Sequence, residues 1–222
     1  MINQALRYQP VVRLLRAASP DRVLEVGSGP EGLAMFWRGP VLGVDVHFKR
    51  RPIHPSIAAS AIALPFADHT WPVVLSCDML EHVPPTVRPQ AVAEMARVTG
   101  ETLYLAFPSG SHAWQTYLRL ADRLGKRSPG WLREHLQYGL PDAYEVAEHL
   151  RAQGLQVRLY WYEDVALHYR MAVLENGLLR YFTYTLARVA GPALVRIFPT
   201  LPLSSQPDNN LRAFIVASRP SR

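Results

Sequence analysis

The sequence contains very little cysteine and lysine and no long uncharged apolar segment. Its 222 residues include one cysteine, Cys77, so no disulfide can form within the chain, which suits a reducing compartment. Lys49 and Lys126 are the two lysines, and the net charge of +6 therefore comes mostly from arginine. This balance allows nucleic acid, a lipid surface or a phosphorylated substrate as a partner without choosing among them. The first ten residues lack the basic and apolar pattern of a secretory leader, which predicts a cytoplasmic protein.

Nothing in the sequence divides the chain into separate units. Hydrophobic residues make up 49% of its length, which is enough to build one sizeable core. No internal repeat or low-complexity tract interrupts the succession of short apolar runs. We therefore expect residues 1–222 to form a single domain.

A glycine-rich turn after the first apolar run is the feature around which the chain is organised. Residues 23–26 (Val-Leu-Glu-Val) read as a buried strand, and Gly27 and Gly29 allow a tight turn with exposed backbone. The apolar residues 33–36 then predict a helix whose first N–H groups point at the same turn. This arrangement predicts a nucleotide-type pocket at the end of a strand.

The charges around this turn decide between two cofactors. The spacing Gly-x-Gly-x-x-Gly over residues 27–32 matches the dinucleotide fingerprint, which places a pyrophosphate at a helix N-terminus. Glu25 and Glu31 would repel a pyrophosphate but attract the ammonium and sulfonium groups of S-adenosylmethionine (SAM). Asp45 ends the next apolar run, where a carboxylate can accept hydrogen bonds from both ribose hydroxyls. The sequence therefore favours SAM over NAD.

Four segments in order carry a resemblance to a known family: VLEVGSG (23–29), VLGVD (41–45), ALPF (63–66) and VVLSCDMLEHV (73–83). The series resembles the class I SAM-dependent methyltransferases and is most similar to the branch often called type 11, which acts mostly on small molecules and lipids. The motifs cover roughly residues 22–107. The resemblance implies an α/β fold: a Rossmann-like seven-stranded sheet with helices on both faces, plus a helical insertion before the last strand.

The charge pattern and the resemblance together imply ten cofactor-binding residues: Glu25, Gly27, Ser28, Gly29, Asp45, Val46, Ser60, Ala61, Asp78 and Met79. Ser60 stands where the family usually has an acidic residue for the adenine amino group, and a hydroxyl is the weaker acceptor. Trp71 and Pro72 replace the usual Phe-Asp ahead of the fourth strand, and Asp68 is the expected substitute for the lost polar contact. These departures concern adenine binding rather than the fold.

Methyl transfer from SAM requires mainly in-line alignment, because the sulfonium is already a good leaving group. A hydroxyl acceptor would also require a base, and histidine suits that role near neutral pH. The candidate catalytic residues are, in order, His112, His135 and His82. For His82 the alternative is a structural hydrogen bond. An amine or enolate acceptor would require no base, and we identify no metal-binding motif.

The segment 164–210 is rich in Leu, Val, Ala, Tyr and Phe, and arginines at 170, 180, 188 and 196 interrupt it. These charges exclude a transmembrane helix and fall within roughly half of a helical wheel. An arginine-bearing amphipathic helix pair is typical of a peripheral membrane element. The alternatives are a lid over the site and a surface that pairs two copies as a homodimer.

The sequence thus predicts a cytoplasmic SAM-dependent methyltransferase of a small-molecule or lipid-linked acceptor, with oxygen, nitrogen and carbon left open as the acceptor atom. No Asn-Pro-Pro-Tyr motif follows the fourth strand, which argues against a nucleobase amino-methyltransferase and against nucleic acid as a partner. Two other functions stay open. One is an RNA methyltransferase, supported by the basic charge. The other is a non-catalytic SAM-binding or assembly protein, suggested by the departures in the adenine region.

Overall fold

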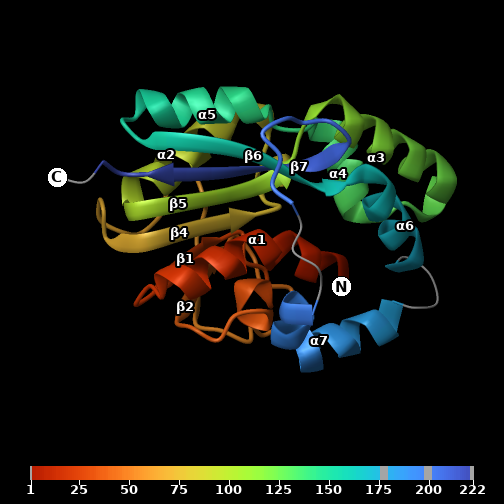
Figure 1. Ribbon diagram of the computed structural model, residues 1–222, viewed down its shortest axis with the longest axis horizontal. Coiled ribbons are helices and arrows are strands. Elements are labelled where there is room, and N and C mark those ends of the chain that lie inside the picture. Colours follow the sequence, from red (N-terminus) through yellow and green to blue (C-terminus); the bar gives the residue numbers. More distant parts are fainter. Residues whose placement is uncertain (1, 176–179, 198–201, 221–222) are drawn as a thin grey trace.

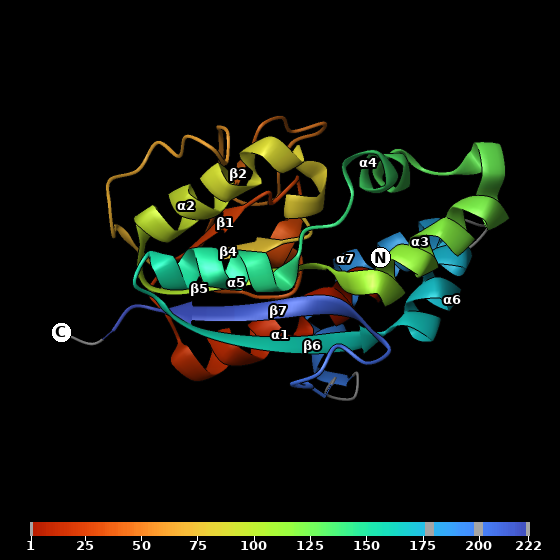
Figure 2. The same cartoon turned by 90° about the horizontal axis from the view of Figure 1, so that it is seen from above.

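The computed structural model describes residues 2–175, 180–197 and 202–220. These residues form a seven-stranded sheet with helices on both faces (Figures 1 and 2). The strands are β1 (Val23–Val26), β2 (Val41–Asp45), β3 (Ser56–Ala58), β4 (Trp71–Cys77), β5 (Thr99–Pro108), β6 (Gln156–Asp164) and β7 (Asn210–Ser218). The helices are α1 (Ile2–Ala18), α2 (Arg88–Val98), α3 (Gly110–Leu124), α4 (Gly130–Tyr138), α5 (Ala143–Ala152), α6 (Val165–Glu175) and α7 (Arg180–Ile197). Four short 3-10 helices are η1 (Gly32–Met35), η2 (Leu80–His82), η3 (Pro85–Val87) and η4 (Gly125–Arg127).

The strand order is β3-β2-β1-β4-β5-β7-β6. Strands β1 to β5 run parallel to one another, and β7 runs antiparallel to both of its neighbours, β5 and β6. Because the chain moves outward in one direction from β1 to β3 and in the other from β4 to β5, the order reverses between β1 and β4. A reversal of this kind leaves a crevice at the carboxyl ends of the two strands, where open α/β sheets bind ligands. The topology and layers confirm the predicted fold class.

Two apolar layers hold the helices against the sheet. On one face α2 and α5 pack on β1, β4, β5 and β7, with Val92, Leu150 and Ile215 fully buried between them. On the other face α1 and the residues of η1 pack on the same strands through Val12, Leu15 and other apolar side chains. In Figure 2 the first pair and α1 lie on opposite sides of the sheet, and α3, α4 and α6 lie beyond one end of the strands. That end is where the cavities open.

The connection between β1 and β2 differs from the prediction. The apolar residues 33–36 were expected to form a helix after the glycine turn, but they form only the four-residue 3-10 helix η1. Helix α7 packs against η1 and α1, and Val195 joins the apolar layer on this face. An element from late in the chain therefore covers the apolar side chains that a longer helix would have covered by itself. The sequence of residues 33–36 contains no local signal for this contact with α7.

Smaller differences occur at the ends of strands. Strand β3 covers Ser56–Ala58. Strand β4 begins at Trp71, so that Pro72 lies inside it rather than ahead of it. The register against β5 shifts between Trp71 and Val73, which is where a proline without an N–H can be accommodated.

The segment 164–210 contains α6 and α7, as the predicted helical insertion requires. Helix α6 packs against α3 and α1, and α7 packs against α1 and η1. Arg188 and Arg196 are exposed, whereas the side chain of Arg180 lies outside the described residues. None of the helices in the described ranges combines the length and the apolar character needed to cross a membrane. The single-domain description and the role of the insertion stay predictions.

Candidate active site

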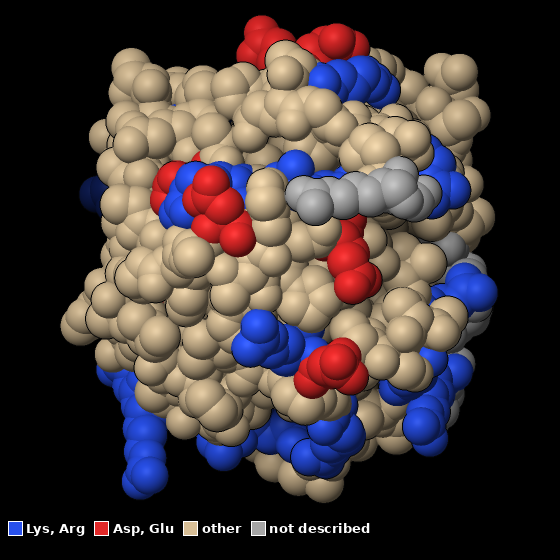
Figure 3. Space-filling view, turned by 90° about the vertical axis from the view of Figure 1, so that its left-hand side faces the viewer, with Lys and Arg blue, Asp and Glu red and all other residues tan. Residues whose placement is uncertain are grey.

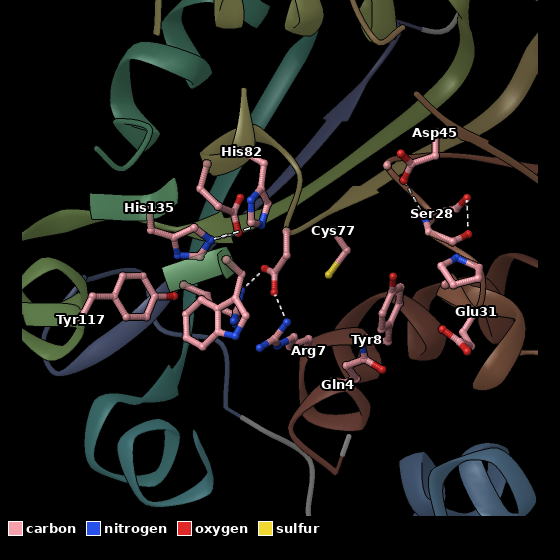
Figure 4. A pocket seen from close by; sticks show the side chains of 18 residues that line it. Gln4, Arg7, Tyr8, Ser28, Glu31, Asp45, Cys77, His82, Tyr117 and His135 are labelled. Atoms are coloured by element: carbon pink, nitrogen blue, oxygen red, sulfur yellow. Dashed lines mark hydrogen bonds and ion pairs between the residues drawn. The ribbon is translucent and has the colours of Figure 1, made fainter. Parts of the chain in front are cut away.

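Two adjoining cavities open at the carboxyl ends of β1, β2 and β4, with volumes of about 410 and 420 Å³. Four residues line both of them: Gly27, Asp45, Asp78 and His82. The cavities therefore form one elongated space. Figure 4 shows Ser28 and Asp45 at one end, and His135 and Tyr117 at the other. We call these the glycine end (residues 27–29 and Asp45) and the histidine end (Glu81, His82, Tyr117, Trp131 and His135).

The glycine end is shaped by two residues that adopt positive φ angles. Gly27 has φ +80°, and a Cβ atom there would lie 2.4 Å from Cγ of Met79. Gly29 has φ +56° and open space around the same position. The N–H of Gly29 donates a 2.9 Å hydrogen bond to Oδ2 of Asp45, which fixes the turn against the end of β2. The turn thus presents bare backbone to the cavity, as predicted, and the Asp45 carboxylate lies beside it.

Glu25 does not line either cavity. Its side chain is fully buried, and its Oε1 accepts a 2.7 Å hydrogen bond from the hydroxyl of Tyr8. Its Oε2 accepts a second one, also 2.7 Å, from the N–H of Leu33. Burial raises the pKa of Glu25 to about 7, although these two hydrogen bonds oppose the rise. The carboxyl group ties β1 to α1 and η1, so its place differs from the expected position beside the cofactor.

A buried charge network lies between the two ends. Asp78 follows β4 with a positive φ of 55° and pairs with Arg7 (2.6 Å between Oδ2 and Nη1) and with Arg212. Arg212 also pairs with Glu163, whose Oε1 accepts a 2.7 Å hydrogen bond from Nδ1 of His168. Burial opposes ionisation of Glu163, but Arg212, His168 and, to a smaller extent, Arg7 lower its pKa to about 2. Two cations thus face two anions, which fixes the start of β7 and the N-terminal helix α1 around the cavity.

The histidine end brings together side chains from η2 and α4. The Nε2 atoms of His82 and His135 lie 3.2 Å apart, and Nε2 of His135 lies 3.8 Å from Oε1 of Glu81. His82 Nδ1 donates a 2.6 Å hydrogen bond to Oε2 of Glu134. The ring of His135 also packs against Trp131, with centroids 5.2 Å apart. Two predicted histidines, 53 residues apart in sequence, are therefore in direct contact.

Burial dominates the protonation of this cluster. It lowers the pKa of His135 to about 2, with the neighbouring His82 adding to the effect, so the His135 ring is neutral. Burial and, to a smaller extent, the nearby Asp78 carboxylate raise the pKa of Glu81 to about 8. Neither carboxylate oxygen of Glu81 has a hydrogen-bond partner among the described residues. The cluster contains ligand and hydrogen-bonding atoms that the protein itself leaves unsatisfied.

Nine of the ten predicted cofactor-binding residues line the cavities, and Glu25 is the exception: Gly27, Ser28, Gly29, Asp45, Val46, Ser60, Ala61, Asp78 and Met79. Ser60 accepts a 3.4 Å hydrogen bond from the N–H of Ile62 through its Oγ. Of the predicted catalytic histidines, His82 and His135 line the space. His112 is exposed on α3 and lines neither cavity, so the structure does not bring the first-ranked candidate to the others.

Several residues of the site were missed from the sequence: Arg7, Tyr8, Glu81, Trp131 and Arg212. Arg7 lies on α1 and Arg212 on β7, and both reach the site only through the tertiary fold. Glu81 stands between an apolar residue and a candidate histidine directly after β4. That position was the one available signal, because ligands bind at the carboxyl ends of parallel strands.

Comparison with known proteins identifies the domain. Residues 24–107, which contain the glycine turn, Asp45 and the histidine of η2, match a family model described as a methyltransferase domain. This part of the chain is similar to a methyltransferase domain. A search of curated proteins gave no significant match. The domain match and the solved structures that resemble the chain confirm the predicted enzyme class and the SAM cofactor that belongs to it.

Solved structures resemble the fold of this protein over nearly the whole chain. The YcgJ protein of Bacillus subtilis matches with a TM-score of 0.57 and 16% identity over 99% of this chain and all of that chain. Magnesium protoporphyrin IX methyltransferase of Synechocystis with bound SAM matches with a TM-score of 0.55 and 11% identity, over 98% and 80%. A toxoflavin-precursor N1-methyltransferase of Burkholderia thailandensis with bound S-adenosylhomocysteine (SAH) matches with a TM-score of 0.53 and 14% identity, over 98% and 79%. At these identities the likeness shows the class I methyltransferase fold.

Proposed function

We propose that this protein transfers the methyl group of SAM to a small-molecule or lipid-linked acceptor that binds at the histidine end. SAM lies along the glycine end, with its ribose at Asp45 and its adenine in the second cavity. The acceptor's nucleophile displaces SAH from the methyl carbon, and a hydroxyl acceptor loses its proton in the same reaction. The products are the methylated acceptor, SAH and a proton.

One observation carries this proposal: Asp78 and His82 line both cavities, so the cofactor and acceptor spaces are continuous. In-line displacement requires the sulfonium and the nucleophile to meet without a wall between them. Asp78 is held at this junction by Arg7 and Arg212. The rigid, charge-balanced junction supports alignment of two bound molecules rather than the binding of a cofactor alone.

The lining of the histidine end supports an acceptor that carries a hydroxyl on a flat or apolar body. Trp131 and Tyr117 provide aromatic surface, with ring centroids 5.9 Å apart. His82 and Glu81 provide polar atoms beside that surface. Aromatic side chains bury flat apolar groups well, and the polar atoms can orient a hydroxyl. An oxygen acceptor fits these surroundings, and it would require the help with deprotonation that the cluster can supply.

An RNA substrate has little support. On the face shown in Figure 3, basic side chains occur in separate clusters, several of them beside acidic ones, and wide areas carry no charge. Among the ion pairs of the described residues, Arg97 pairs with both Asp68 and Glu94 at 2.7 Å. Nucleic-acid binding in contrast relies on basic groups that are available to phosphates. The basic composition is therefore no argument for RNA on this face.

The deciding experiment has two arms that use the same purified protein. Calorimetric titration with SAH should show one binding site. Incubation with SAM labelled in its methyl group and a cell extract, followed by partition between chloroform and water, should move label into an acceptor. Label in the chloroform phase would indicate a lipid-linked acceptor, and label in the aqueous phase a soluble metabolite.

Asp45→Asn is the control for the transfer arm, since it should bind SAH at least about 10-fold more weakly and should transfer correspondingly less label at subsaturating SAM. A folded protein that does not bind SAH at high micromolar concentration would contradict the whole proposal. SAH binding without transfer to any extract would instead favour the non-catalytic alternative.

A further inference from the structure

Three side chains at the histidine end offer ligand atoms to a common point. A nitrogen of His82, a nitrogen of His135 and a carboxylate oxygen of Glu81 all lie within 4.8 Å of one another. Two ligand atoms that each lie about 2.0–2.1 Å from a tetrahedral Zn²⁺ are roughly 3.3 Å apart. The two Nε2 atoms are already separated by 3.2 Å, and Nε2 of His135 lies 3.8 Å from Oε1 of Glu81. The third pair, between His82 and Glu81, lies within 4.8 Å, so the Glu81 carboxylate would have to approach both nitrogens to complete the ligand set.

Glu81 is an unusual residue in this position. It is fully buried, it lines the cavity, and both of its oxygens lack a hydrogen-bond partner among the described residues. A buried carboxylate without partners is costly, and buried charges are normally paired or bound to a metal. The charge network beside it offers no relief, because Arg7 and Arg212 are already matched by Asp78 and Glu163. These pairings leave Glu81 without a counter-charge of its own.

The histidines have the surroundings that metal ligands usually have. His82 donates its Nδ1–H to Glu134 at 2.6 Å, which leaves the lone pair of Nε2 for another partner. A carboxylate that holds the second nitrogen of a ligating histidine is a common arrangement, because it fixes the tautomer and ring orientation. His135 is 4% exposed and is enclosed by Tyr117 and Trp131. Its orientation is thus set by packing rather than by solvent.

From this geometry we propose that Glu81, His82 and His135 bind a divalent transition-metal ion. Two imidazole nitrogens and one carboxylate suit Zn²⁺ and its first-row neighbours, whereas Mg²⁺ and Ca²⁺ prefer oxygen ligands alone. Three protein ligands leave at least one coordination position open toward the cavity, which is typical of a catalytic metal rather than a structural one. The sequence reasoning identified two of these ligands only as candidate bases.

The role of the ion rests on the proposed function. An acceptor oxygen in the open position would be polarised by the ion and would release its proton more readily. The ion's two positive charges would exceed the one negative charge of Glu81, and the acceptor oxyanion would balance the remainder. Methyl transfer to that oxygen then neutralises it and weakens its hold on the ion, which favours product release.

Metal binding can be tested without any methyl transfer. The tag-free protein is stripped with a chelator, dialysed and titrated with Zn²⁺ alone, and bound metal is measured by elemental analysis. We expect one equivalent of Zn²⁺ and a rise in melting temperature on its addition. Glu81→Gln and His135→Asn should each weaken Zn²⁺ binding more than about 100-fold, since even the loss of a residue that only supports a ligand costs roughly 10- to 100-fold.

Two further variants separate this site from other histidines and from misfolding. His112→Asn removes an exposed histidine that lines neither cavity and should leave Zn²⁺ binding unchanged. Glu134→Gln should weaken binding by roughly 10- to 100-fold, because it removes only the partner of His82 Nδ1. Glu81→Gln without metal should melt at or above the wild-type temperature, which would show that it still folds.

The proposal is overturned if the wild type binds less than half an equivalent of Zn²⁺ and its melting temperature does not respond. It is equally overturned if His112→Asn weakens Zn²⁺ binding as much as His135→Asn does, because binding would then be general surface histidine binding. SAH titration of the same samples keeps the two proposals apart. Failure to bind Zn²⁺ with normal SAH binding refutes the metal site and leaves the proposed function intact.

Discussion

The hydroxyl of Tyr8 donates a 2.7 Å hydrogen bond to Oε1 of Glu25, which joins the N-terminal helix to the strand beneath the glycine turn. The other oxygen of Glu25 holds the N–H of Leu33 in η1. A Cβ atom on Gly32 would lie 2.2 Å from Oε2 of Glu25, so the third glycine of the motif makes room for this carboxyl group. Part of the glycine pattern therefore serves the scaffold rather than the cofactor.

This buried carboxyl group should give the protein a characteristic pH dependence. Burial raises the pKa of Glu25 from 4.5 to about 7, so between those values the folded protein holds a proton that the unfolded chain has lost. The free energy of unfolding therefore falls as pH rises from about 4.5 to about 7, by at most about 3 kcal/mol. In Glu25→Gln this contribution is absent, and the stability of the variant relative to wild type should rise over the same interval.

Urea denaturation of both proteins at pH 5 and pH 8 measures this difference. Glu148→Gln on α5 is the matched control, because Glu148 is exposed and its removal should leave the pH profile unchanged. Parallel profiles for wild type and Glu25→Gln would show that the Glu25 carboxyl group titrates normally and that its burial is misjudged.

The two glycines of the turn should respond differently to alanine. In Gly27→Ala the new methyl group would overlap the side chain of Met79, in addition to the strain of φ +80°. In Gly29→Ala only backbone strain arises, since no atom lies within 4 Å of the new Cβ. We expect a loss of about 1 kcal/mol of stability for Gly29→Ala and about 2–4 kcal/mol for Gly27→Ala, together with loss of SAH binding in the latter.

Thermal denaturation and SAH titration compare the two variants. Met79→Ala should partly restore Gly27→Ala, because it removes the atoms that the new methyl group would meet. Equal effects of the two glycine variants, with no rescue, would mean that strain rather than the contact with Met79 decides the loss.

Much of the fold followed from the order of short apolar runs, because each strand of a parallel sheet is buried on both faces and reads as a continuous hydrophobic segment. Asp45 could be placed because a carboxylate at the end of the second strand must lie near the turn after the first. The contact between His82 and His135 could not be predicted, since nothing local in η2 specifies where α4 will pack. The prediction of a longer helix at residues 33–36 was wrong for the same reason, because α7, from late in the chain, packs over the apolar side chains of η1.

Asp45 should carry a large share of the affinity for SAH. Its carboxylate lies at the junction of both cavities and is oriented by the N–H of Gly29 at 2.9 Å. Asp45→Asn keeps the size of the side chain but replaces charged acceptors by neutral groups, which roughly halves the strength of hydrogen bonds to a ribose. We expect SAH to bind at least about 10-fold more weakly in calorimetric titrations, from a loss of roughly 1.5–3 kcal/mol.

The matched control for Asp45→Asn is Asp122→Asn, which changes an exposed carboxylate on α3 and should bind SAH as the wild type does. Wild-type affinity in Asp45→Asn would show that the ribose does not bind at Asp45, and would contradict the proposed orientation of the cofactor.

Helix α7 has one face packed against the protein and one face exposed, so its role in packing over η1 can be tested separately from membrane contact. Gly191 is buried, and a methyl group there would lie 2.3 Å from the carbonyl oxygen of Met35 in η1. Gly191→Ala should therefore displace α7, lower stability by about 1–3 kcal/mol and weaken SAH binding through η1. Val189 is 77% exposed on the same helix, and Val189→Glu should change neither property.

The membrane prediction concerns only the open face of α7. If that face lies on a lipid surface, the wild type should float with anionic liposomes. Val189→Glu should float less, since a carboxylate opposes both insertion and the surface charge. SAH titration of the Val189→Glu sample confirms that the site is unchanged. If wild type and Val189→Glu both stay in solution, α7 acts as a cover for α1 and η1, and the acceptor search begins with soluble metabolites.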